Sequence, residues 1–318
     1  MKYAYLVLAH NNPQQLERLL NRLQDPAVEF YIHVDKKCDI SSFLYITKIS
    51  KNIHFINERY KVFHRGYASI NATLALLKAA QKTNPDYNIL MSGAEYPIKS
   101  NQYIKDFLFD RKGAEFISFF RLQDRPAWLK KVEQYFYWDS RFTQFNGGVE
   151  FTSKRFRRLQ KKLAKRIPNR KFIDGLEPYG GSQWWMISDD CARFVIDYIE
   201  GSWRFRQFFR FTDVPNELVF QTVILNSPFA RKVMNWSEYD DEEKRKQLHS
   251  TWPCPASVYN FRYIDWTPER QSGSGHPVTL DEQDFDCLEK SHCLFARKMD
   301  SKKSAALMNR IDKELLKI

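Results

Sequence analysis

The first hundred residues alternate between short apolar runs and stretches with helical spacing, and this alternation constrains the fold more than any other feature. Residues 3–9 form an apolar run, and four leucines between positions 16 and 23 then recur at helical spacing. A second apolar run at 30–34 completes a βαβ unit, which implies a parallel pair of strands with a right-handed crossover. The pattern continues with a strand at 53–56, a helix over 68–80 and a strand at 88–91. It predicts an α/β fold with a mostly parallel sheet flanked by helices.

Two carboxylates follow predicted strands closely. Within the stretch 87–101, Glu95 comes just past the predicted strand at 88–91. Ser100 or Asn101 would then cap the helix that follows. Asp35 comes directly after the second strand. Ligands of open α/β sheets gather at the carboxyl ends of strands, so both carboxylates are candidate ligand contacts. A connector or capping role explains each of them about equally well.

Charge and composition limit the possible partners. The chain has 318 residues, 43% of them hydrophobic, which is enough for a sizeable core, and a net charge of +12 indicates a negatively charged partner. No apolar stretch approaches the roughly 20 residues of a membrane span, and the N-terminal run is interpreted as a strand rather than a signal peptide. The five cysteines are scattered without C-x-x-C spacing, which is typical of reduced thiols and predicts a cytoplasmic location.

The strongest concentration of charge lies at 154–171, which holds ten Lys or Arg residues and no acid. Apolar residues recur within it at Phe156, Leu159, Leu163 and Ile167, so the segment is predicted to be a basic amphipathic helix. Three interpretations remain open. The helix would lie on an anionic membrane surface, track a phosphate backbone, or pack its apolar stripe on its own domain.

Aromatic and polar residues in the second half are candidate sugar contacts. Trp128 and Lys131 belong to a segment dense in aromatic and charged residues, and Ser182, Trp184 and Trp185 follow a Gly-Gly pair. Sugars stack their apolar faces on aromatic rings and bond their hydroxyls to polar groups. Neighbouring tryptophans on a strand point to opposite faces, so one would pack inside while the other faces a cleft. Core packing is the alternative for each ring.

The common catalytic signatures GxxxxGK[ST], HExxH, GxSxG and GxGxxG are absent from the sequence. The single Asp-x-Asp triplet, at 284–286, falls inside a predicted helix, so no metal ligand set is expected. A bound diphosphate would then need Arg or Lys, and Arg262 and Lys298 are candidates because each adjoins a short apolar run. Glu217 lies in the first turn of a predicted helix that opens at Pro215, where the helix dipole favours an ionised carboxylate.

Seven segments occur in an order that resembles one enzyme family: YLVLAHNNPQQLERLL, YIHVDKK, LMSGAEYPIKSN, GGSQWWMISDDC, NELVFQTVILNSPF, FRYIDW and LFARKMD. Together they resemble the core-2/I-branching β-1,6-N-acetylglucosaminyltransferases, a family that also contains the peptide O-xylosyltransferases. The resemblance extends over nearly the whole chain. It implies a GT-A-like fold, a UDP-sugar donor, inversion at the anomeric carbon and no metal requirement.

The resemblance also implies roles for individual residues. Glu217 matches the catalytic base, Lys298 matches the lysine that contacts the UDP phosphates, and Arg262 is the best match for a second phosphate contact. Asp35, which closes the His-Val-Asp motif, is similar to the residue that contacts uridine. Glu95 stands in the Gly-Ala-Glu-Tyr-Pro loop, where many relatives carry Asp. Animal members of the family are Golgi membrane proteins with a stem and disulfides. Neither a membrane anchor nor a set of disulfides is expected here, so this chain looks like a bacterial member.

These expectations combine into one hypothesis. Residues 1–318 form a single GT-A-like domain, with a nucleotide-sugar-binding half at 1–110 and an acceptor-binding, catalytic half at 111–318. The enzyme transfers a sugar, with GlcNAc as the first choice, from a UDP-sugar to a glycan or lipid-linked glycan hydroxyl, without metal or other cofactor. It would be peripheral on the inner membrane face through 154–171, with no nucleic acid partner. The alternatives are a UDP-xylose-dependent xylosyltransferase, a non-enzymatic protein that binds anionic polymers, and a catalytically silent scaffold.

Overall fold

The computed structural model describes residues 1–138, 162, 167–234, 236–237, 241, 243, 259–271 and 276–317. The predicted basic helix at 154–171 lies outside the described residues except for 162 and 167–171. Within the described ranges, every helix is too short or too polar to cross a membrane.

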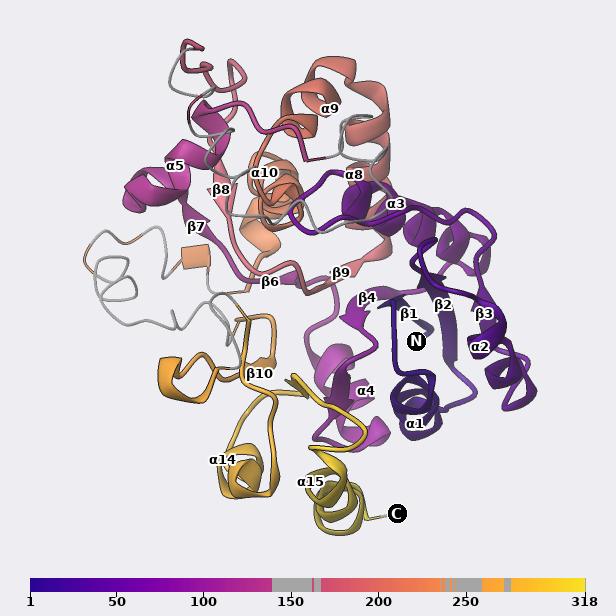
Figure 1. Ribbon diagram of the computed structural model, residues 1–318. Helices are drawn as coiled ribbons and strands as arrows, with labels where there is room; N and C mark the ends of the chain where they lie inside the picture. The colour runs from indigo at the N-terminus through magenta and orange to yellow at the C-terminus, as the bar shows by residue number, and fades with distance from the viewer. Residues whose placement is uncertain are drawn as a thin grey trace.

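The core of the molecule is a six-stranded sheet with the order β3-β2-β1-β4-β9-β6 (Figure 1). Its strands are β1 (Tyr3–Ala9), β2 (Val28–Val34), β3 (Ile53–Phe55), β4 (Tyr87–Ser92), β6 (Phe116–Ile117) and β9 (Trp185–Ser188). The first four strands run parallel, and β9 is antiparallel to both β4 and β6. The parallel strands are nearly continuous in buried apolar residues, because helices cover both faces. The predicted α/β class is confirmed.

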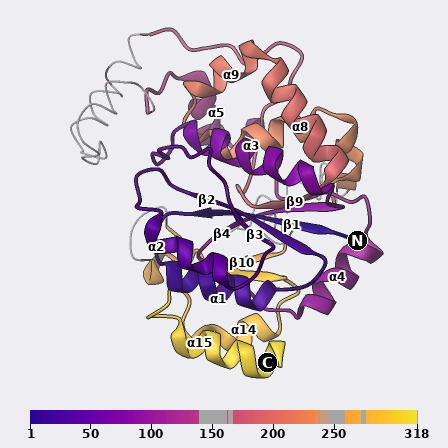
Figure 2. The same cartoon turned by 90° about the vertical axis from the view of Figure 1, so that its right-hand side faces the viewer.

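Helices form one layer on each face of this sheet (Figure 2). One face is covered by α1 (Pro13–Leu23), α2 (Ser41–Leu44) and α4 (Asn101–Asp110). The other face is covered by α3 (Ala68–Ala80), α8 (Asp189–Gly201), α9 (Trp203–Arg210) and α10 (Val219–Leu225). The two main hydrophobic clusters fill the spaces between the sheet and these layers. At the rim, α5 (Pro126–Glu133) adjoins the short antiparallel pair β7 (Phe120–Arg121) and β8 (Tyr179–Gly180).

A second, three-stranded sheet builds the C-terminal lobe. It has the order β10-β11-β5 and consists of β5 (Glu95–Pro97), β10 (Arg262–Ile264) and β11 (Phe295–Arg297). Its helices are α14 (Phe285–Glu289) and α15 (Ala305–Arg310), and α15 continues as η8 (Ile311–Leu316). Figure 2 shows the yellow C-terminal helix packed beyond α1. Asp312 of η8 connects this helix to α1, because it accepts hydrogen bonds from Arg18 and Arg22 of α1 at 2.7 and 2.8 Å.

Helix starts follow the sequence signals in most places. Ser100 caps α4 as predicted, because its hydroxyl accepts the Tyr103 N–H at 3.2 Å. The run Thr-Leu-Asp-Glu at 279–282 has the sequence pattern of a capping box, but the cap does not lie at Thr279. Asp281 caps a short turn, η7 (Glu282–Asp284), and Asp284 completes the box. The chain stays extended up to Leu280, whose N–H donates to the Lys298 carbonyl at 2.9 Å, so no helix starts earlier.

Candidate active site

The candidate site lies where the parallel strands end. The chain leaves β1 toward β2 on one side and later returns to β4 on the other, so the carboxyl ends of β1 and β4 flank a topological switch point. Backbone bonds hold the strand ends together: the Asp35 N–H donates to Ala9 at 2.8 Å and the Gly93 N–H donates to Leu8 at 3.0 Å. Such a switch point is where open α/β sheets bind ligands.

Asp35 lies at this edge, as predicted, and is buried. Its Oδ1 accepts the backbone N–H of Lys37 at 2.9 Å, and its Oδ2 lies 3.5 Å from the ammonium of Lys37. Arg59 donates to the carbonyls of Asp35 and Val34 at 2.9 and 2.8 Å. The carboxylate is therefore held in a rigid turn at the strand end. Its contact with uridine stays a prediction.

Lys298 lies on the same edge, although it is far from Asp35 in sequence. Partial burial and the charges of Lys298 and Lys37 lower the pKa of His10, while Asp35 opposes them. His10 follows β1 directly, and the Met299 N–H, next to Lys298, donates to the Ala94 carbonyl just past β4 at 2.8 Å. The structure thus brings Asp35 and Lys298 into one neighbourhood.

Glu217 ends the short turn η4 (Pro215–Glu217), and α10 begins only at Val219. The predicted single helix from Pro215 is therefore interrupted, because Leu218 has a non-helical backbone. The Glu217 carbonyl accepts the Gly181 N–H at 2.9 Å. Its half-buried carboxylate has no hydrogen-bond partner among the described residues. Burial raises the pKa of this carboxyl, and the charges of Lys131, Arg65 and Arg297 oppose the rise.

Polar and aromatic groups surround Glu217 on its α5 side. Arg65 donates from Nε to Asp213 at 2.6 Å, and the Trp138 indole donates to the same carboxylate at 3.0 Å. The Lys131 ammonium lies 3.4 Å from the ring centroid of Trp128. Burial lowers the pKa of Lys131, and the charge of Glu217 opposes this. Trp128 and Lys131 therefore lie side by side on α5, and their contact with an acceptor stays a prediction.

The paired tryptophans are enclosed by protein. Trp185 is fully buried with its ring centroid 5.5 Å from that of Phe220, and Trp184 is 7% exposed beneath the Arg297 guanidinium, 4.7 Å from its ring centroid. The rings contact different neighbours, and Trp185 is the one that packs inside, so a sugar contact by Trp185 is wrong. Trp184 lies beside Arg297, and its contact with a substrate stays a prediction. Both faces of β9 are covered, because Trp185 and Ile187 pack into one hydrophobic cluster and Met186 packs into the other.

Ser182 shapes the turn before β9. Its N–H donates to the Ser118 hydroxyl at 2.8 Å, and its own hydroxyl accepts the Trp184 N–H at 3.3 Å. A Cβ at Gly181 would lie 1.9 Å from the Ser118 carbonyl oxygen, so only glycine allows this approach. The turn carries Ser182 past the Glu217 carbonyl. A substrate contact by its side chain stays a prediction.

Arg262 and Glu95 are not placed to touch a ligand. Their side chains are both 0% exposed and form an ion pair, with Nε and Oε2 3.4 Å apart. Arg262 also donates to the carbonyls of Asn260 and Leu90, at 2.6 and 3.0 Å. The expected phosphate contact by Arg262 and substrate contact by Glu95 are therefore wrong, because the pair is enclosed where the two sheets meet.

Arg297 is the functional candidate that the sequence reasoning missed. It ends β11 next to Lys298, it is half-buried, and its Nε has no hydrogen-bond partner among the described residues. Burial lowers the pKa of its guanidinium, and the charges of Glu95 and Glu217 oppose this. The Ala-Arg-Lys run was visible in the sequence. Its significance depends on β11 pairing with β5, which no local pattern indicates.

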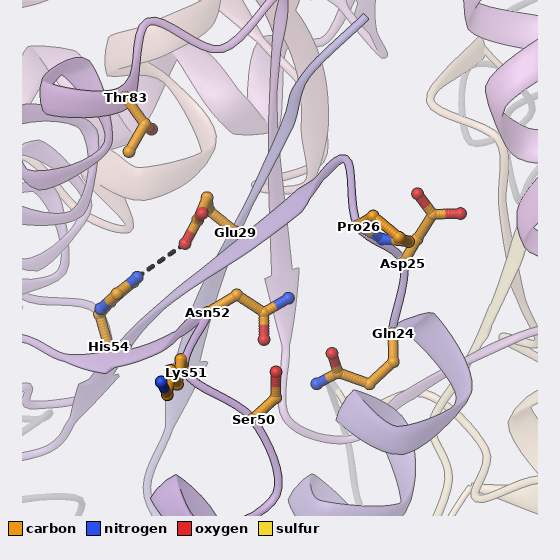
Figure 3. A pocket seen from close by; sticks show the side chains of 9 residues that line it. All are labelled: Gln24, Asp25, Pro26, Glu29, Ser50, Lys51, Asn52, His54 and Thr83. Atoms are coloured by element: carbon orange, nitrogen blue, oxygen red, sulfur yellow. Dashed lines mark hydrogen bonds and ion pairs between the residues drawn. The ribbon is translucent and has the colours of Figure 1, made fainter.

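A surface depression of about 640 Å³ lies elsewhere, at the amino-terminal ends of β2 and β3 (Figure 3). Gln24, Asn52 and Thr83 contribute to its wall, and a hydrogen bond of 2.7 Å joins His54 to Glu29 across it. Because Asp35 and Lys298 lie at the opposite edge of the sheet, the depression is separate from the candidate site.

Comparisons with known proteins identify the family of the chain. Residues 3–288 match the family described as "Branch: Core-2/I-Branching enzyme". Xylosyltransferase 2 of Rattus norvegicus is 25% identical over 98% of this chain and 33% of its own length. Xylosyltransferase oxt of Drosophila melanogaster is 24% identical over 80% of this chain and 28% of its own length, so the chain spans about a third of these relatives.

Among solved structures, mouse xyloside xylosyltransferase 1 in its apo form overlaps with a TM-score of 0.33 and 12% identity, over 71% of this chain and 82% of the other. That overlap is too low to carry an argument, and the family match carries the assignment. The chain therefore belongs to the Core-2/I-Branching enzyme family, a family of glycosyltransferases.

Proposed function

We propose that this chain transfers a sugar from a UDP-sugar to an acceptor hydroxyl with inversion, and that Glu217 is the general base. One observation carries the proposal. A half-buried carboxylate without a hydrogen-bond partner among the described residues lies within the electrostatic reach of Arg297, and Arg297 is followed by Lys298. A base and a cationic site for a leaving diphosphate are the two groups that such a transfer needs.

Glu217 would remove the proton from the acceptor hydroxyl as its oxygen attacks the anomeric carbon. The bond between that carbon and the UDP oxygen breaks, and its electron pair leaves on the diphosphate. Burial raises the pKa of Glu217 and so strengthens it as a base, while Lys131, Arg65 and Arg297 favour its ionised form. A base must be ionised before it accepts the proton, so both effects serve the step.

Arg297 and Lys298 would neutralise the departing diphosphate. Arginine offers a planar fork of donors and lysine a compact charge, and both suit phosphate oxygens. Arg297 replaces Arg262 in the expected pair, because Arg262 is enclosed. With two cations at this place, we propose that the transfer needs no metal. The described residues contain no group of three His, Cys, Asp or Glu side chains that would hold one.

The relatives support two donors. The proteins with the matches described above are named xylosyltransferases, which favours UDP-xylose. The resemblance to the β-1,6-N-acetylglucosaminyltransferases favours UDP-GlcNAc. Asp35 would contact the nucleoside, and Trp128 and Lys131 would contact a glycan or peptide acceptor. A screen of UDP release with a panel of UDP-sugars, with and without EDTA, tests the proposal. Release that requires added Mn²⁺ or Mg²⁺ would contradict metal independence.

We also propose that the basic segment 154–171 brings the enzyme to an anionic membrane, where it would meet a lipid-linked acceptor. Its ten Lys or Arg residues support this, since each cation near such a surface is worth about 1 kcal/mol. Co-sedimentation with phosphatidylserine vesicles at low salt is the test. Equal binding to neutral and anionic vesicles, or no binding, would count against it, and salt-sensitive binding to DNA alone would favour the polymer-binding alternative.

A further inference from the structure

A single enclosed side chain links the two sheets. The Arg262 guanidinium lies in β10 of the C-terminal sheet, yet one of its nitrogens donates to the Leu90 carbonyl of β4 at 3.0 Å. A second nitrogen donates to the Asn260 carbonyl at 2.6 Å, and Nε faces Glu95 Oε2 at 3.4 Å. Every nitrogen of the guanidinium therefore has a protein partner. Because the side chain is also 0% exposed, its remaining N–H groups do not reach a ligand at the surface.

Glu95 completes the link from the other side. Its Oε1 accepts the Ser92 N–H, at the end of β4, at 2.9 Å. Its backbone pairs with Arg297 in the antiparallel register of β5 and β11. Arg262 pairs with Phe295 in the next ladder, and its guanidinium carbon lies 5.1 Å from the centroid of that ring. Both members of the ion pair thus contact β11, the strand that ends at Arg297.

The value of this pair lies in geometry rather than in stability. A buried ion pair contributes little net stability, because desolvation of both charges offsets their attraction. An arginine fork, however, fixes the relative positions of the groups that it bonds, whereas an apolar side chain of similar volume fixes none of them. Here the bonded groups belong to β4, to β5 and to Asn260, which precedes β10. Strand β11 lies between β5 and β10, ends at Arg297 and is followed by Lys298.

We infer that Arg262 and Glu95 are positioning residues, which hold Arg297 and Lys298 at the distance from the carboxyl ends of β1, β2 and β4 that a donor diphosphate requires. This inference rests on the proposed role of Arg297 and Lys298. Neither Arg262 nor Glu95 touches the donor. A displacement of about 1 Å in such a site can cost about 100-fold in function, so small movements of β11 matter.

The test compares Arg262→Lys with Ile199→Ala by calorimetric titration of the full chain with UDP. Lysine keeps the charge but loses the fork to Leu90 and Asn260. Ile199 is buried in α8 on the other face of the main sheet, so its truncation lowers stability without touching the pair. We expect the Kd for UDP to rise about 10-fold to 100-fold in Arg262→Lys and to change less than about twofold in Ile199→Ala. Glu95→Gln, which is isosteric, replaces Arg262→Lys if the latter does not fold.

A second measurement separates this inference from the proposed function. In the wild type, the Met299 N–H donates to Ala94 at 2.8 Å and the Lys298 N–H to Val278 at 3.3 Å. We expect hydrogen exchange of the 295–299 amides to accelerate in Arg262→Lys and to stay unchanged in Ile199→Ala. Wild-type exchange there, together with wild-type UDP affinity, would overturn the inference. If the wild type binds no UDP, the proposed function fails, and the exchange data still decide whether the pair holds β11.

Discussion

Glu115, just before β6, offers the most direct test of how burial changes the pKa of a carboxyl in this protein. It is fully buried, and its carboxylate accepts two hydrogen bonds from Ser188, from the N–H at 2.8 Å and from the hydroxyl at 2.6 Å. Burial raises the pKa of this carboxyl from 4.5 to about 7, although the bonds from Ser188 oppose the rise. Glu115→Gln keeps the shape, and its amide can donate to the Ser188 hydroxyl while its oxygen accepts the N–H.

The sign of the pH effect follows from the direction of this change. A carboxyl whose pKa is raised on folding contributes stability that is fully present below pH 4.5 and is lost as the pH rises through about 7. A rise of this size corresponds to about 3 kcal/mol. Glutamine does not titrate. The free energy of unfolding of the wild type, relative to Glu115→Gln, should therefore fall by about 3 kcal/mol between pH 4.5 and pH 8.

The comparison with the variant is needed because His33 acts in the opposite direction. Its Nε2 accepts the Tyr60 N–H at 2.9 Å, and burial lowers its pKa from 6.5 to about 4. Its contribution is present above pH 6.5 and is lost as the pH falls through about 4, so it partly cancels that of Glu115 in the wild type. The difference between the two proteins removes the His33 contribution.

Urea unfolding followed by tryptophan fluorescence at several pH values between 4.5 and 8 measures this difference. The exposed Glu289→Gln variant is the matched control, and its unfolding free energy should run parallel to that of the wild type. Parallel profiles for Glu115→Gln and the wild type would refute the argument. They would mean that water or a local movement relieves the burial of Glu115.

Two further predictions concern the site. Arg297→Ala and Lys298→Ala should each weaken UDP binding by about 1.5–3 kcal/mol, because a hydrogen bond to a charged group is lost. Calorimetric titration measures the change, and unchanged affinity in both variants would exclude the proposed phosphate site. Because burial raises the pKa of Glu217, kcat/KM should fall on the acid side at a higher pH than an ordinary glutamate would give. A pH–rate profile that is flat down to pH 5 would contradict this.

The sequence predicted local features well. The strand Tyr3–Ala9 and the helix Ala68–Ala80 have the predicted bounds, because their apolar spacing directly reflects burial. Asp35 was placed correctly at a strand end, since position after a strand determines the edge of a parallel sheet on which a residue lies. These are properties of neighbouring residues, and periodicity reports them.

Long-range pairing explains what the sequence did not reveal. Residues 95, 262 and 297 meet only because β5, β10 and β11 form one sheet, and no spacing along the chain encodes that contact. Pattern reasoning also assumes that charged side chains are exposed, so the enclosed pair of Arg262 and Glu95 was interpreted as ligand-binding. The prediction that Trp185 contacts sugar was wrong for a related reason. Its strand is covered on both faces, which a four-residue strand does not show in its own sequence.

The central claim is that Glu217 takes the acceptor proton, and one comparison tests it most directly. Single-turnover transfer and UDP binding are measured for the wild type, for Glu217→Gln and for the exposed control Glu289→Gln, with the donor found in the screen. As general base, Glu217→Gln keeps UDP affinity and loses about 10²–10⁴-fold in the rate of transfer, while the control matches the wild type. Transfer at the wild-type rate in Glu217→Gln would contradict the account, and so would a loss explained entirely by weaker UDP binding.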